Sequence, residues 1–164
     1  MRRIWIVLVA LLILGGINFS IYKNEILLEQ GTLLLLELAP LDPRSLMQGD
    51  YMNLRYKIVR DASQPSQRDG YLIIEIDENH VGHFKSFYTD GTSLTPQEHL
   101  LRFRQRRGEI QLGAESFFFQ EGHAQYYEPA RYGELRVAPS GESILVGLRD
   151  EYFRVLDAPR EGIK

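Results

Sequence analysis

The stretch Gly31-Thr32-Leu33-Leu34-Leu35-Leu36-Glu37-Leu38-Ala39-Pro40 marks the place where the chain changes character. Its apolar run, Thr32 to Leu38, is continuous rather than alternating, and it lies between a glycine and a proline. Seven residues are too few for a stable helix, and an apolar run of this length is typical of a strand buried on both faces. We therefore predict that a β domain starts at this strand.

On the N-terminal side, the residues from Ile4 to Tyr22 form an apolar window without a charged side chain. A helix of this length spans about 28 Å, close to the roughly 30 Å hydrocarbon thickness of a bilayer. Arg2 and Arg3 precede it, and arginines beside a span favour the cytoplasmic side. We predict a transmembrane anchor over residues 1–22, with a cytoplasmic N-terminus. The rest of the chain is then extracytoplasmic, which means periplasmic in a Gram-negative cell.

Two other interpretations of this segment fit less well, namely a cleaved signal peptide and a buried core helix. A signal peptide needs small residues at an Ala-x-Ala-like cleavage site, and the residues from Gly15 to Tyr22 match that pattern poorly. A buried helix rarely stays apolar on every face over this length. We expect Lys23 to Gln30 to continue the helix, with Gly31 as its stop.

On the C-terminal side, short segments alternate apolar and polar residues in the way that strands do. On the first of them, Met52, Leu54, Tyr56 and Ile58 are predicted to face inward. The predicted strands cover 51–58, 71–77, 83–88, 101–106, 109–112, 116–119, 133–137 and 143–148, with a short helical turn at 123–128. This pattern predicts an all-β sandwich or small barrel over residues 23–157, preceded by one transmembrane helix and followed by a polar tail at 158–164.

Composition argues against several classes of function. Lysines and arginines number 19 against 22 acidic residues, so no basic excess points to nucleic acid as a partner. Because Arg2 and Arg3 are the only charged residues of the anchor, the chain beyond it carries a net charge of −5. The chain has no cysteine, which excludes disulfides, thiolate zinc sites and a cysteine nucleophile. No pattern in the sequence points to a cofactor.

One motif stands out, the segment GDYMNLRY from Gly49 to Tyr56, which contains Gly-Asp-Tyr-x-x-Leu-x-Tyr in full. In this motif the chain resembles the GDYXXLXY family, as it does in the segments FFFQEG (117–122) and ARYGELRV (130–137). The resemblance covers nearly the whole length. It implies a membrane-anchored bacterial protein of unassigned function, often associated with multi-span membrane proteins, and it implies no reaction.

The motif has both a structural and a functional interpretation. Gly49 allows a tight turn into the strand, and Asp50 can accept hydrogen bonds from the amides of that turn. Tyr51 is out of phase with the inward-facing set, so packing does not account for it and a partner surface or ligand wall would. We therefore predict a non-enzymatic binding module for another membrane or envelope protein. Its candidate binding residues are Asp42, Arg44, Gly49, Asp50, Tyr51, Tyr56 and Glu121.

The competing interpretation is an envelope hydrolase. The residues from Leu46 to Asp50, after an N-terminal anchor, are similar to the segment that follows the nucleophile in type I signal peptidases, which use a Ser-Lys pair. The nucleophile position is Leu41 here, and Ser45 stands where that family usually has threonine. No lysine is predicted at a suitable place in the core, and a nucleophile without a base is a poor one. We predict no catalytic residue.

Three weaker patterns remain. The pair His80 and His83 straddles a predicted turn without a clear third ligand, so we predict no metal site. Glu121 and His123 allow acid–base chemistry on paper, although a turn is the commoner explanation. A small-ligand sensor would need an interior pocket. A basic stripe on one predicted strand is typical of a solvated face, or of a site for an anionic partner or lipid headgroup; it consists of Arg102, Arg104, Arg106 and Arg107.

Overall fold

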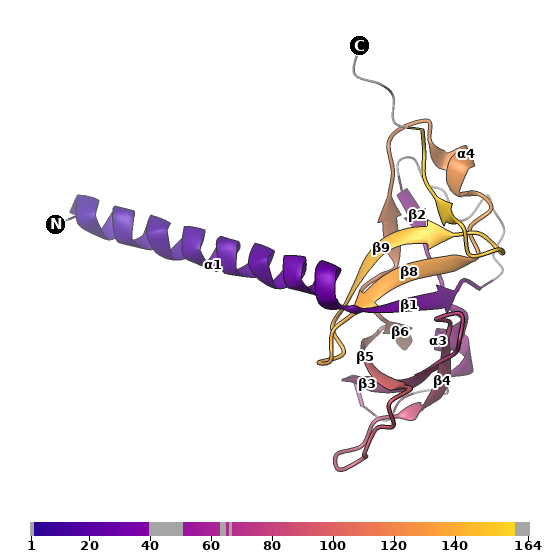
Figure 1. The fold of residues 1–164 in the computed structure, drawn as a ribbon. Helices are drawn as coiled ribbons and strands as arrows, with labels where there is room; N and C mark the ends of the chain where they lie inside the picture. The colour runs from indigo at the N-terminus through magenta and orange to yellow at the C-terminus, as the bar shows by residue number, and fades with distance from the viewer. Residues whose placement is uncertain (1, 40–50, 63–64, 66, 160–164) are drawn as a thin grey trace.

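The computed structural model describes residues 2–39, 51–62, 65 and 67–159. Helix α1 (Arg2–Gln30) projects from one side of a β-rich body (Figure 1). Apolar side chains stand exposed along it, with Leu12 and Phe19 each 71% exposed. In the part of the chain that the structure describes, it is the one helix long and apolar enough to cross a membrane. The predicted continuation beyond Tyr22 is confirmed, because the helix runs unbroken to Gln30.

Gly31 ends the helix, as predicted, but for a different physical reason. The Gly31 N–H still donates to the Leu27 carbonyl at 3.0 Å, as a further helical residue would. A Cβ atom at Gly31 would collide with that carbonyl oxygen and lie 3.0 Å from the Cβ of Arg136. Glycine is therefore needed for space where the helix meets strand β8 (Tyr132–Val137), rather than for a left-handed backbone.

The strand that follows is the first of a four-stranded antiparallel sheet with the order β1-β8-β9-β10. Leu34, Leu35 and Leu36 are consecutive and all buried, so the prediction of a strand covered on both faces is confirmed. Strand β10 was not predicted, because two residues carry no alternation. The bounds are β1 (Thr32–Glu37), β8 (Tyr132–Val137), β9 (Ser143–Arg149) and β10 (Val155–Leu156).

A second four-stranded sheet has the order β4-β3-β5-β6. Leu72, Ile74, Leu101 and Phe103 are buried from β3 and β5, with the alternation expected of the strands predicted over 71–77 and 101–106. The turn at Arg107-Gly108 has positive φ at both residues, which suits a two-residue hairpin. The bounds are β3 (Asp69–Ile76), β4 (Gly82–Phe87), β5 (Glu98–Arg106) and β6 (Glu109–Gln111).

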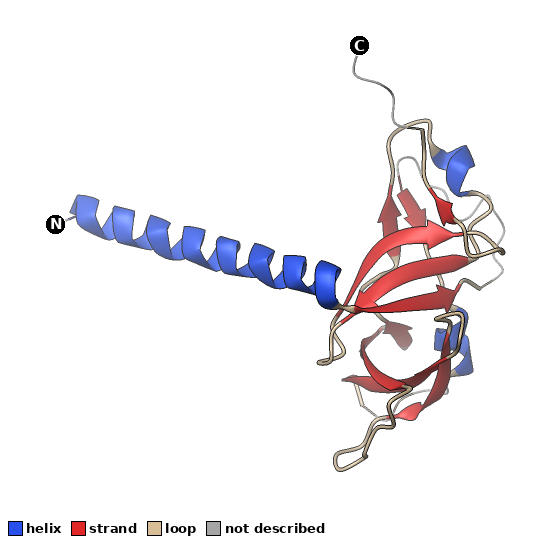
Figure 2. Ribbon diagram, viewed as in Figure 1, coloured by secondary structure: helices blue, strands red, loops and turns tan. Residues whose placement is uncertain are grey.

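The two sheets curl into half-barrels around a shared core, with a small third sheet beside them (Figure 2). That third sheet is a two-stranded ribbon of β2 (Tyr51–Asn53) and β7 (Ser116–Phe118). A short helix α4 (Ala124–Tyr127) follows the ribbon, where a helical turn was predicted. The all-β fold class is therefore confirmed. Part of the predicted polar tail, 160–164, lies outside the described residues.

The prediction of a strand over 51–58 is wrong beyond Asn53. After three paired residues the chain makes only a single bridge, Leu38 to Tyr56, and then enters helix α3 (Lys57–Asp61). The inward positions survive this change, since Met52, Leu54, Tyr56 and Ile58 are all buried. An alternation of period two fixes which side chains face the core, but it does not show where the partner strand stops.

Candidate functional site

Four of the seven predicted binding residues, Asp42, Arg44, Gly49 and Asp50, lie outside the described residues. Of the other three, Tyr56 is enclosed in the core with 2% of its surface exposed. Its hydroxyl donates to the Ala114 carbonyl at 2.5 Å. Burial raises the pKa of the Tyr56 hydroxyl, and the nearby Glu115 carboxylate adds to the rise, so the group stays neutral. This position favours the structural interpretation of Tyr56.

Tyr56 also explains a glycine in another segment that resembles the family. The ring lies against β8 at Gly133, where an added Cβ atom would come within 2.9 Å of the Tyr56 Cε1 atom. Gly133 is buried in the middle of the sheet, opposite Leu36 of β1. The last tyrosine of GDYMNLRY and the glycine of ARYGELRV are therefore two halves of one packing contact.

Tyr51 lies on the other side of the ribbon, facing away from the core. Its ring is 5.8 Å from that of Phe118, which is 73% exposed. The two neighbours of Phe118 point the opposite way, since Phe117 and Phe119 pack on Tyr127 with ring centroids at 4.9 and 5.5 Å. We call the outward pair, Tyr51 and Phe118, the ribbon face. The predicted strand over 116–119 did not indicate which of its phenylalanines face outward.

Glu121 is exposed in the turn that follows β7, where Gly122 has a φ of 82°. The turn is closed by a hydrogen bond from the His123 N–H to the Gln120 carbonyl at 3.0 Å, and the His123 ring packs edge-on against Tyr126. The structure thus places Tyr51 against Phe118, buries Tyr56 in the core and leaves Glu121 exposed in the turn after β7.

A groove of about 510 Å³ runs beside the motif, and no pattern in the sequence indicated it. Asn53 and Arg55 line it with exposed side chains, and both occupy unspecified positions of the motif. Arg60, Glu109 and Glu115 add charges of both signs. The specified residues Leu54 and Tyr56 border the same groove but are buried, so two of the three described specified residues of the motif serve packing.

Lys57 and Lys85, the two lysines nearest along the chain after the motif, are both ion-paired. Lys57 donates to Glu37 at 2.9 Å, and Lys85 pairs with Glu98. Hydrogen bonds to these carboxylates, with their charge, raise the pKa of each lysine. A lysine acting as a general base needs a lowered pKa, so the shifts run in the opposite direction. Ser45 and Leu41 lie outside the described residues.

The histidine pair belongs to a hairpin turn. The Asp77 carboxylate accepts hydrogen bonds from the N–H groups of Asn79 and Val81, each at 2.8 Å, and its other oxygen lies 3.3 Å from the His83 Nε2 atom. His80 occupies the turn itself with a φ of 63°. Within the described ranges, no group of three or more histidine, aspartate or glutamate side chains is placed to hold a metal ion.

Comparison with known proteins gives one match. A family model described as "GDYXXLXY protein" matches residues 13–148, which run from the middle of α1 to the end of β9. No curated protein and no solved structure matches the chain.

Proposed function

The chain belongs to the GDYXXLXY family, whose function is unassigned, and from this premise we propose that it is a single-pass membrane protein whose β domain binds another membrane protein. The N-terminus is cytoplasmic and the β domain extracytoplasmic. The domain acts as an accessory module without catalysis, and its partner is a multi-span membrane protein. Helix α1 supplies the anchor.

The observation that carries this proposal is the direct junction between α1 and the β domain. Only Gly31 separates the end of the helix from β1, so no linker intervenes. Lys23 pairs with Glu142 at 2.7 Å, and Arg136 donates to the Gly31 carbonyl at 3.2 Å. A domain held this closely to a span stays at the membrane surface, where its accessible partners are other membrane proteins.

Charge around the helix supports the orientation. Arg2 and Arg3 precede the apolar window, while Lys23 at its other end is paired with Glu142. Basic residues that flank a span favour the cytoplasmic side. Two basic residues therefore flank the N-terminal end of the window directly, and one, Lys23, flanks the other end.

The ribbon face supports the binding role. Exposed aromatic rings are enriched in protein interfaces, because they bury a large apolar area at low conformational cost. Phe118 presents such a ring, 73% exposed, with the half-buried Tyr51 beside it on a separate two-stranded sheet. Tyr51 also follows the candidate binding residues Gly49 and Asp50 directly along the chain.

Site-specific photocross-linking in native membranes tests the partner. A photoreactive phenylalanine analogue replaces Phe118 in one variant and Leu94 in the control. Leu94 is also exposed, and its loop between β4 and β5 projects from the end of the molecule opposite the ribbon (Figure 1). We expect an adduct from position 118 that contains a multi-span membrane protein, and none from position 94. No adduct from position 118, or the same adducts from both positions, would contradict the proposal.

A further inference from the structure

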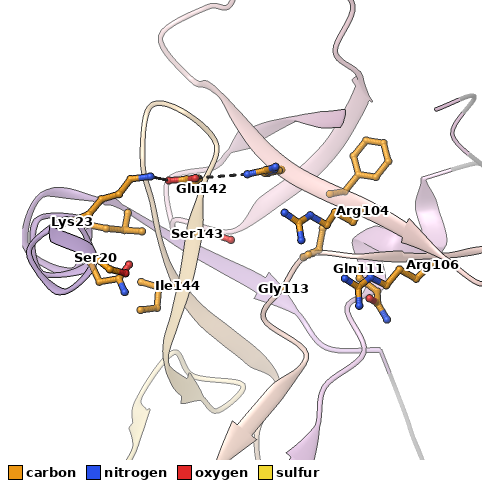
Figure 3. Close-up of a pocket in the computed structure, with 14 residues that line it drawn as sticks. Ser20, Lys23, Arg104, Arg106, Gln111, Gly113, Glu142, Ser143 and Ile144 are labelled. Atoms are coloured by element: carbon orange, nitrogen blue, oxygen red, sulfur yellow. Dashed lines mark ion pairs between the residues drawn. The ribbon is translucent and has the colours of Figure 1, made fainter. Parts of the chain in front are cut away.

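A second groove, of about 540 Å³, lies where α1 meets the β domain (Figure 3). One wall is the last part of the helix, with Ser20, Lys23 and Asn24. The opposite wall is β5 with its basic stripe, and the hairpin that carries Glu142, Ser143 and Ile144 forms a third side. The ribbon face and its proposed partner are not part of this site.

The stripe faces the groove because β5 alternates. Leu101 and Phe103 point into the core, so Arg102, Arg104 and Arg106 project from the other face. Arg107 lies in the following turn and does not line the groove. Only the first three arginines of the predicted stripe therefore share one site.

Cations outnumber anions in this groove. The Glu142 carboxylate forms ion pairs with Lys23 at 2.7 Å and with Arg102 at 3.6 Å. Arg104 is paired with Asp69 at 3.8 Å, and both of these side chains are exposed. Arg106 is exposed and makes no ion pair with any residue that the structure describes. Four basic groups thus share two carboxylates, which leaves an excess of two positive charges.

The groove lies beside the C-terminal end of the apolar window of α1. Lys23 is the first charged residue after the apolar window, so the helical turns around it are where a spanning helix leaves the hydrocarbon. Leu27 and Ile144 give the groove an apolar part beside its arginines. A site with this combination suits a molecule that carries an anionic group on an apolar chain.

We propose that this groove binds the phosphate of an anionic phospholipid headgroup, with Arg104 and Arg106 as its main ligands. A guanidinium group fits a phosphate with two parallel hydrogen bonds, and a groove of this volume is large enough for a headgroup. Ser20 and Asn24 offer further polar groups from the helix side. The inference rests on the proposed membrane anchoring by α1, but it needs neither the orientation nor the protein partner.

Native mass spectrometry of the full-length protein in mild detergent tests this proposal. Phosphatidylglycerol and phosphatidylcholine with the same acyl chains are added at equal concentration, with and without an equal concentration of inorganic phosphate. We expect phosphatidylglycerol to be retained at least about tenfold over phosphatidylcholine. We expect inorganic phosphate not to displace it. Displacement would identify a free-phosphate site and overturn the lipid assignment, as would equal retention of the two lipids.

Two sets of variants locate the site. We expect R104Q/R106Q to remove most of the preference for phosphatidylglycerol over phosphatidylcholine. R106Q alone is expected to remove part of this preference and to leave folding unchanged, because Arg106 makes no ion pair among the described residues. R55Q/R60Q removes the same charge from two exposed arginines of the other groove and is expected to keep the preference. Equal loss in both double variants would overturn the proposal. Failure of the anchoring itself would show separately, as protein recovered outside the membrane fraction.

Discussion

The contact between Tyr56 and Gly133 predicts a stability difference between two glycines of one sheet. In Gly133→Ala the new methyl group lies within 2.9 Å of the Tyr56 ring, so we expect a loss of about 1–3 kcal/mol in the free energy of unfolding. The matched control is Gly147→Ala on the neighbouring strand β9, where a Cβ atom meets nothing within 4 Å. We expect a change of less than about 1 kcal/mol there, and in the stabilising direction, because alanine restricts the unfolded chain.

Urea denaturation of the full-length protein in detergent, followed by circular dichroism, measures both changes. Equal effects of the two substitutions would contradict the packing role of Gly133.

A second residue, Asp150, predicts how stability depends on pH. Its buried carboxylate accepts hydrogen bonds from the Tyr152 and Arg154 N–H groups at 2.9 Å and from the Arg154 side chain at 2.7 Å. Burial alone would raise the pKa of Asp150, but these hydrogen bonds and the charge of Arg154 outweigh it and lower the pKa. A lowered pKa in the folded state stabilises the protein above the unfolded-state value of about 3.9, and this contribution is lost as the pH falls below it.

We therefore expect Asp150→Asn to be less stable than the wild type at neutral pH, with a difference that narrows as the pH falls below about 4. Thermal melts from pH 7 to pH 2 measure it. Asp157→Asn, at an exposed aspartate, serves as the control and is expected to follow the wild type. A difference that stays constant over the whole range would show that the cost of the substitution does not come from the charge.

At the scale of elements, the ribbon of β2 and β7 predicts opposite behaviour for two adjacent phenylalanines. Phe117 packs on Tyr127, while Phe118 is 73% exposed. We expect Phe117→Ala to lower the free energy of unfolding by about 2 kcal/mol, less than a fully buried phenylalanine because the ring is only partly covered. Phe118→Ala is expected to change it by less than about 0.5 kcal/mol and to weaken binding to the partner instead.

Pull-down from native membranes and urea denaturation, run on the same two variants, separate the effects. If Phe118→Ala destabilised the domain as much as Phe117→Ala, the ribbon face would be a packing surface.

The sequence predicted elements well where hydropathy has a clear period, and poorly where an element ends by contact with a distant one. Leu72 and Ile74 alternate along β3, and the run Leu34 to Leu36 is buried on both faces, so both strands could be predicted. The early end of β2 could not, because it depends on β7 more than sixty residues away. For the same reason, the opposite orientations of Phe117 and Phe118 could not be predicted without the pairing of β2 with β7.

At the scale of the whole molecule, the candidate sites depend on contacts that no local pattern encodes. Lys23 and Glu142 are more than a hundred residues apart and still form the ion pair that closes the groove between α1 and the β domain. The sequence indicated the basic stripe but not the helix opposite it. In the motif, the alternation indicated that Tyr51 does not face the core. The structure shows that the Tyr51 ring instead lies against Phe118 on the outer side of the ribbon.

The proposed function depends above all on α1 spanning a membrane and placing the β domain on the far side. Since the chain has no cysteine, a single engineered cysteine is its only target for a maleimide. We propose to label Ser93→Cys, exposed in the loop between β4 and β5, and a variant with one cysteine inserted after Met1, in intact cells with a membrane-impermeant maleimide. With a cytoplasmic N-terminus and an extracytoplasmic β domain, we expect Ser93→Cys to be labelled in intact cells and the N-terminal cysteine only after permeabilisation. The reverse pattern, or labelling of Ser93→Cys only after permeabilisation, would contradict the proposed function.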